Sequence, residues 1–190
     1  MSTVNDTQAS PQTVAGNYTL DPAHSRIGFV ARHAMVTKVR GSFNDFEGSG
    51  YFDPDSPEKS HLEVTIKATS IDTRNADRDA HLRSNDFFAM DDHPEIHFVS
   101  TGVTKVDGDV YRVTGDLTIK GVTRPVTIDF EHQGAAKDPF GNDRIGFEGS
   151  VSVNRKDWGI NFNAALESGG VLVSEKVVLE FELSAIKSAS

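Results

Sequence analysis

Apolar and polar residues alternate with a period of two over most of the chain beyond residue 16. Leu62, Val64 and Ile66 share one face of an extended segment, and Glu63 and Lys67 share the other. Alternation of this kind predicts strands that bury one face and expose the other. The same pattern recurs at residues 27–32, 111–120, 126–130 and 145–153.

Turn residues separate these segments. Asp107-Gly108 is a strong hairpin signal, and Asn44-Asp45 predicts a hairpin between Val39–Phe43 and Phe46–Phe52. Segments that bury one face and are joined by short turns must pack as two antiparallel sheets or close into one barrel.

The last segment favours the barrel. The pattern predicts one strand over Val171–Ile186, and sixteen residues would span about 50 Å. A typical strand has only about five or six residues. We therefore expect an all-β protein, an elongated antiparallel β-barrel of about eight strands that is lipocalin-like in shape.

The two-residue period breaks in the middle of the chain. Residues 75–84 are polar and charged and predict a short helix, with Asp72 or Thr73 as its N-cap. An aromatic pair, Phe87-Phe88, follows. The segment is expected to form a helical lid at one end of the barrel. The alternative is that the helix simply closes that end and the two rings are core, and the two interpretations are compatible.

Composition and length indicate one domain. Residues 1–16 are rich in Ser, Thr, Gln and Asn and predict a disordered leader. Residues 17–187 are expected to form the barrel domain, and 188–190 a short tail. The net charge of −9 argues against nucleic acid or an anionic membrane as the main partner.

Several classes of protein are disfavoured. The chain has no cysteine, so disulfides and thiolate chemistry are excluded. Its N-terminal residues show no signal-peptide pattern, and no apolar run reaches the roughly 18 residues of a spanning helix. We expect a cytoplasmic protein without a transmembrane segment.

Candidate catalytic and metal-binding motifs are weak. His93 and His97 have a four-residue spacing, but Pro94 between them opposes the helix that would bring them together. Residues 21–25 contain Asp, His and Ser, which in a catalytic triad normally come from distant segments. The sequence predicts no metal site, no cofactor and no catalytic residue.

Four stretches resemble the YceI-like, polyisoprenoid-binding family of bacterial proteins. They are DPAHSRIGFVARHAMVTKVRGSF (21–43), SIDTRNADRDAHLRSNDFFAMDDHPEIHF (70–98), VTGDLTIKGVTRPVTIDF (113–130) and NRKDWGI (154–160). The resemblance implies an elongated barrel that holds a long-chain amphiphile, such as a polyprenyl phosphate, a quinone tail or a fatty amide. Family members are binders or carriers without established catalysis. Many carry a secretion signal, which this sequence lacks.

We therefore expect a lipid- or isoprenoid-binding barrel that could carry or sequester its ligand, and a homodimer is compatible with the sequence. Burial of the tail would drive binding with few polar anchors. The candidate tail contacts share the inward face of the predicted strands or the aromatic pair. They are Phe29, Phe43, Leu62, Val64, Phe87, Phe88, Leu117, Ile128, Phe130, Phe147, Leu179 and Phe181.

The ligand's polar head would lie at a mouth of the barrel, where a phosphate needs donors. Arg78, His81 and Arg32 are the candidates. Alternatively, Arg78 could form an internal salt bridge with Asp72, Asp77 or another carboxylate.

Two other functions remain open at this point. An enzyme acting on an apolar substrate in the same cavity would need polar groups beside the lumen, among which His81 is the first to inspect. A scaffold barrel with a filled core would bind no ligand.

Overall fold

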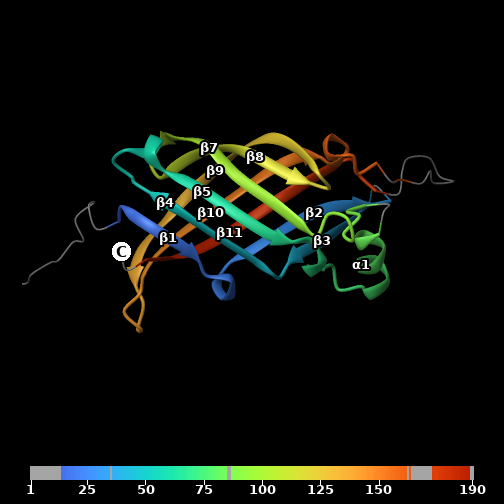
Figure 1. The fold of residues 1–190 in the computed structure, drawn as a ribbon, viewed down its shortest axis with the longest axis horizontal. Helices are drawn as coiled ribbons and strands as arrows, with labels where there is room; N and C mark the ends of the chain where they lie inside the picture. Colours follow the sequence, from blue (N-terminus) through green and yellow to red (C-terminus); the bar gives the residue numbers. More distant parts are fainter. Residues whose placement is uncertain (1–13, 35, 85–86, 162, 164–172, 189–190) are drawn as a thin grey trace, which may run out of the picture.

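A computed structural model describes residues 14–34, 36–84, 87–161, 163 and 173–188. Strands dominate it and one short α-helix, α1 (Ala76–Arg83), interrupts them (Figure 1). The strands are β1 (Gly16–Leu20), β2 (Arg26–His33), β3 (Thr37–Phe43), β4 (Phe46–Phe52), β5 (His61–Lys67), β6 (Ile71–Asp72), β7 (Glu95–Asp107), β8 (Val110–Ile119), β9 (Val122–Lys137), β10 (Asp143–Asn154) and β11 (Lys176–Lys187).

Eight antiparallel strands close into a barrel in the order β1-β4-β5-β7-β8-β9-β10-β11. The closing pair is β1 with β11, where Leu20 lies opposite Ala185. Long strands make the barrel elongated, and β9 with 16 residues is the longest of them. The predicted all-β fold, an antiparallel barrel with a short helical segment, is confirmed.

At the helix end, β2 takes the place of β1 beside β11. Phe29 lies opposite Leu179 there, and the sheet continues from β2 through β3 to β6. The helix α1 follows β6 and lies at this end of the barrel (Figure 1). The two ends are therefore built differently, because β1 completes one of them and β2, β3 and α1 complete the other.

The hairpin predicted at Asn44-Asp45 is wrong, although β4 has the expected bounds. Strand β3 pairs with β2 and β6, whereas β4 pairs with β1 and β5. The two turn residues bond a different segment, since the Asn44 amide donates to the Ser70 carbonyl and the Lys67 amide donates to the Asp45 carbonyl.

The last strand also begins later than predicted. Strand β11 starts at Lys176, Val173 forms only an isolated bridge with His33, and Val171 lies outside the described residues. The guanidinium of Arg155 donates hydrogen bonds to the carbonyls of Val173 and Ser174. These carbonyls therefore bond a side chain instead of a neighbouring strand.

The expected N-cap of α1 is corrected as well. Asn75 caps the helix, because its side chain accepts a hydrogen bond of 3.0 Å from the Arg78 amide. Arg74 has a φ of +63°, and this left-handed turn places Asn75 instead of Asp72 or Thr73 at the first helical turn.

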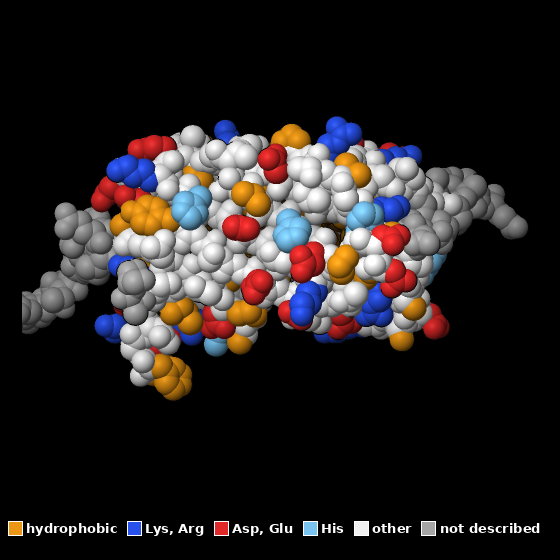
Figure 2. Space-filling model, in the orientation of Figure 1, with side chains coloured by type: hydrophobic (Ala, Val, Ile, Leu, Met, Phe, Trp, Pro, Cys, Tyr) orange, Lys and Arg blue, Asp and Glu red, His pale blue; other side chains and the backbone are white. Residues whose placement is uncertain are grey.

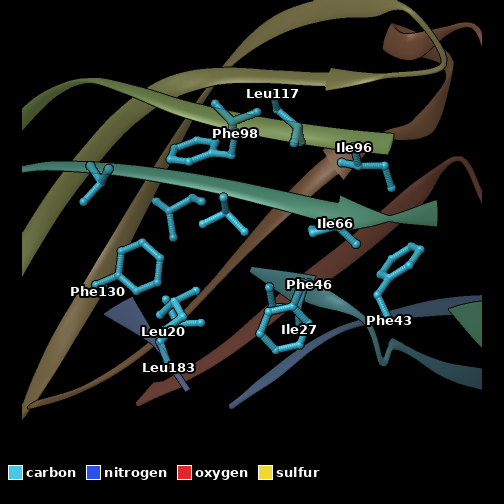
Figure 3. Close-up of a cluster of buried hydrophobic side chains, with 14 of the residues drawn as sticks. Leu20, Ile27, Phe43, Phe46, Ile66, Ile96, Phe98, Leu117, Phe130 and Leu183 are labelled. Carbon is cyan, nitrogen blue, oxygen red and sulfur yellow. The ribbon is translucent and has the colours of Figure 1, made fainter. Parts of the chain in front are cut away.

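The inward faces of the barrel strands form one apolar core. Figure 3 shows side chains from opposing strands pointing toward one another, with Phe46 and Ile27 in the middle of the group. On the face of the molecule shown in Figure 2, charged side chains of both signs are interspersed with isolated apolar ones. The lumen is therefore the apolar environment in which a ligand could be buried.

Candidate ligand-binding site

The core is incompletely filled at the helix end. A cavity there has about 920 Å³ of free space, a volume that includes open solvent at its mouth. Phe29, Leu179 and Phe181 line it and are only partly buried. Arg155 is the one charged residue among the described residues that line it. We call this space the helix-end cavity.

A second cavity lies toward the opposite end of the barrel and has about 620 Å³ of free space, again with its mouth included. Aromatic residues from five strands line it, among them Phe52 of β4, Tyr111 of β8 and Phe147 of β10. The Phe52 ring packs edge-on against both of the others, at 5.1 Å between ring centroids in each case. We call it the far-end cavity.

A layer of side chains divides the two cavities, as strand β5 shows. Leu62 lines the far-end cavity and Ile66 lines the helix-end cavity, while Val64 between them lines neither. The members of this dividing layer face inward and are at most 8% exposed. They are Leu20, Phe46, Val64, Phe98 and Ile128.

The twelve predicted tail contacts are thus distributed over three places. Val64 and Ile128 belong to the dividing layer. Leu62, Phe130 and Phe147 line the far-end cavity. The helix-end cavity brings together the remaining seven, which are Phe29, Phe43, Phe87, Phe88, Leu117, Leu179 and Phe181.

The predicted lid pair lies at the helix-end cavity. The Phe88 ring packs edge-on against Phe43, with 6.1 Å between centroids, and the Phe87 ring packs edge-on against His81 at 5.0 Å. Phe87 is 6% exposed, so this ring is both part of the packed core and part of the cavity wall.

A groove between the β2–β3 tip and α1 forms the mouth of the helix-end cavity. The groove and the cavity share lining residues, among them Phe29, Leu82 and Phe87. All three predicted headgroup residues, Arg32, Arg78 and His81, line this groove, together with residues such as His33 and Asp77. The structure therefore brings the candidate headgroup residues together next to the apolar space.

The expected carboxylate partner of Arg78 is wrong, because Thr73 holds the side chain. The guanidinium donates from Nε to Thr73 Oγ1 at 2.7 Å and from Nη2 to the Thr73 carbonyl at 2.6 Å. Thr73 in turn donates to the buried Asp79 carboxylate. By contrast, the Arg83 guanidinium donates to the carbonyls of Thr69 and Ile71, away from the groove.

Arg155 is a site residue that the sequence did not single out, although it lies in the NRKDWGI stretch (154–160). It is 6% exposed, and its guanidinium donates to the carbonyls of Ile160, Val173 and Ser174. Burial lowers the pKa of this arginine, an effect that Glu175 partly opposes. Arg155 thereby fastens the wall of the helix-end cavity after β10. A lone arginine in a polar motif gives no sign of this role.

His132 was also missed, although a signal exists. It continues the inward series of Val126, Ile128 and Phe130 along β9. Its ring lies 4.9 Å from that of Phe147, between centroids, and its Nε2 is buried without a hydrogen-bond partner. Burial lowers the pKa of His132, while the Asp109 carboxylate opposes this effect.

Other kinds of site find little support in the described part of the chain. Within it, no group of three or more His, Asp or Glu side chains is placed to hold a metal ion. No helix of that part is long and apolar enough to cross a bilayer.

Comparison with known proteins places these features in a family. A model described as a YceI-like domain matches residues 18–185. A UPF0312 protein of Photorhabdus laumondii is 46% identical over 155 residues, which cover 80% of this chain and 79% of that protein. The crystal structure of a Campylobacter jejuni YceI protein has a TM-score of 0.69 and 32% identity, covering 83% of this chain and 90% of that one.

A polyisoprenoid binding domain from Saccharophagus degradans, implicated in plant cell wall breakdown, has a TM-score of 0.68. Its identity is only 16%, with coverage of 90% of this chain and 98% of that one, so this likeness shows the fold alone. The family model, by contrast, spans almost the whole barrel. The chain therefore belongs to the YceI-like family.

Proposed function

We propose that this protein binds one long-chain amphiphile, with the apolar tail in the helix-end cavity and the polar head in the mouth groove. The observation that carries the proposal is the combination of an incompletely filled, almost wholly apolar cavity with a groove that holds Arg32, Arg78 and His81. Burial of apolar surface contributes about 25 cal/mol per Å², so a long tail binds without many polar contacts.

An isoprenoid tail is the ligand we favour. The cavity walls are branched aliphatic and aromatic, and the Saccharophagus degradans relative in fold is described as binding polyisoprenoid. Such a binder could carry or sequester its ligand. The free space in both cavities supports a binder over a filled scaffold barrel. Catalysis would need several polar groups beside the tail, and the described lining of the helix-end cavity offers a single charged side chain, Arg155, which is already hydrogen-bonded.

The test is titration with a fluorescent long-chain acyl probe, competed by an unlabelled prenyl alcohol. We expect saturable binding that Phe181→Asp abolishes, because Phe181 lines the helix-end cavity. Val99→Asp is the matched control, since Val99 is 46% exposed on the outside of β7. Circular dichroism establishes that both variants are folded. No binding to the native protein, or unchanged binding in folded Phe181→Asp, overturns the proposal.

A further inference from the structure

The charge of the β2–β3 hairpin differs in sign from that of the whole protein. The chain carries a formal charge of −9, but residues 32–40 contain Arg32, Lys38 and Arg40 and no Asp or Glu. At about 0.1 M salt, exposed charges more than roughly 10 Å apart are largely screened. A surface that approaches the hairpin therefore meets its local positive charge before the net negative charge.

The hairpin places these cations together. Arg32 lies directly opposite Lys38, and Arg40 follows Lys38 by two residues on the same face of β3. Like charges opposite one another on neighbouring strands destabilise a sheet. None of the three pairs with a carboxylate of the described residues, whereas Arg26, Arg112 and Arg144 elsewhere do. The cluster thus makes no ion pair among the described residues, although Asp77 lines the mouth groove together with Arg32.

An apolar side chain is exposed at the tip of the same hairpin. Val36 is 77% exposed, in a turn where Ala34 has a φ of +52°. In amphipathic helices that lie on membranes, apolar side chains enter the boundary between lipid headgroups and acyl chains while Lys and Arg face the headgroups. The tip therefore combines the two features that interfacial binding needs.

The hairpin also adjoins the mouth of the helix-end cavity. Arg32 lines the mouth groove, while Lys38 and Arg40 line a shallow recess beside it that is completed by Thr73 and Arg78. Lys and Arg stand beside Asp and Glu at this end of the molecule in Figure 2, but the described lining of the recess includes no carboxylate. A surface bound to the hairpin would thus lie next to the cavity mouth.

We propose that the β2–β3 hairpin docks the protein on an anionic lipid bilayer, with Arg32, Lys38 and Arg40 at the headgroups and Val36 in the interface. The inference builds on the proposed function, because it supplies the route by which a poorly water-soluble tail passes between the bilayer and the cavity. Docking itself needs no bound ligand, so it is measured separately from tail binding.

The experiment is flotation of the full chain with vesicles of phosphatidylcholine alone and of an equimolar mixture with phosphatidylglycerol. We expect binding to the anionic vesicles only, weakened by added salt. Each cation near the surface strengthens binding by about fivefold, so Lys38→Gln with Arg40→Gln should weaken it roughly 25-fold. Val36→Ser should weaken it severalfold with an unchanged salt dependence.

The matched control is the double variant Lys59→Gln with Lys137→Gln, which also removes two exposed cations. Lys59 lies in the η3 turn (Pro57–Lys59) and Lys137 at the end of β9. This control changes the net charge by as much as the hairpin variant does and should leave flotation unchanged. Equal flotation with both vesicle types, no flotation, or an equal loss in hairpin and control variants overturns the inference. A dimer that the hairpin variant dissociates, without vesicle binding, would instead identify a second copy as the partner. If vesicles bind but the acyl probe does not, the proposed function fails and the docking stands.

Discussion

The ring of Phe29 lies against the backbone of Gly41, its direct partner across the β2–β3 pair. A Cβ at position 41 would overlap the Cζ of Phe29. Phe130 has the same relationship to Gly149, and the Phe98 ring lies against Gly115, which is diagonal to it across the β7–β8 pair. At Gly41 the missing side chain lets the Phe29 ring lie along the barrel wall, so this glycine keeps space open in the helix-end cavity, which Phe29 lines.

Gly41→Ala should therefore narrow the helix-end cavity. The Phe29 ring must leave the wall, and overpacking of this kind costs about 1–3 kcal/mol. We expect roughly tenfold weaker binding of the acyl probe. Gly102→Ala is the control, because nothing lies within 4 Å of a Cβ there. Adding Phe29→Leu to Gly41→Ala should restore binding, and unchanged affinity in folded Gly41→Ala would rule out this role of the glycine.

Arg78→Gln tests the headgroup site. Titration in parallel with a prenyl phosphate and the uncharged prenyl alcohol should show a selective loss of affinity for the phosphate. The guanidinium lines the groove, and its Nη1 donors are not among those that bond Thr73. Arg83→Gln is the control, since Arg83 also bonds backbone carbonyls but is not part of the groove lining. Equal losses for both ligands, with a lower melting temperature, would show that Arg78 only holds Thr73.

His132 should make stability depend on pH between about 7 and 5. Its folded-state pKa is lowered by burial, so the unfolded chain takes up a proton near pH 6.5 that the folded chain does not. Stability is therefore lost as pH falls through this window. The slope cannot exceed about 1.4 kcal/mol per pH unit, and partial exposure of the ring makes it smaller.

Denaturant titrations of the native protein and of His132→Phe at several pH values check this predicted pH dependence of stability. The aspartates Asp21 and Asp138 titrate below this window, because hydrogen bonds from Arg144 hold the pKa of each carboxyl below its usual range. We expect a flatter pH dependence in His132→Phe. The same slope in both proteins would contradict the assignment.

Arg155→Met should lower the free energy of unfolding by about 3 kcal/mol. The substitution removes the donor of the Ile160 and Ser174 carbonyls, while the Val173 carbonyl keeps a hydrogen bond from the Asn163 side chain. An unsatisfied buried acceptor costs about 1–3 kcal/mol. Lys156→Met is the control, because Lys156 is exposed and its pair with Glu175 contributes little. Similar urea midpoints for the two variants would argue against the role of Arg155.

Local pattern predicted the strands well and their pairing less well. The alternation located β4 and β5 closely, and the Asp107-Gly108 turn joins β7 to β8 as expected. The hairpin predicted at Asn44-Asp45 was wrong because these residues form hydrogen bonds with residues 67–70, which no local pattern reveals. The predicted start of the final strand was wrong for a similar reason. The carbonyls of Val173 and Ser174 accept hydrogen bonds from the Arg155 side chain, which the local pattern does not reveal.

The candidate site was predicted as a set of residues but not as an arrangement. Periodicity identifies Leu62, Val64 and Ile66 as one inward face, yet it cannot show that they belong to two cavities and the layer between them. That division depends on how side chains from opposite walls meet. His132 could have been found from the inward phase of β9. Arg155 could not, because it bonds the carbonyls of Ile160, Val173 and Ser174 in irregular segments, which no periodic pattern reveals.

The central claim is that the lumen holds an amphiphile, and native mass spectrometry of the protein purified from its own host tests it most directly. We predict a population heavier than the bare chain by one long-chain lipid per chain, which organic extraction removes and which Phe181→Asp lacks. A folded protein that shows only the mass of the bare chain, and that takes up no acyl probe when one is added, would contradict the account.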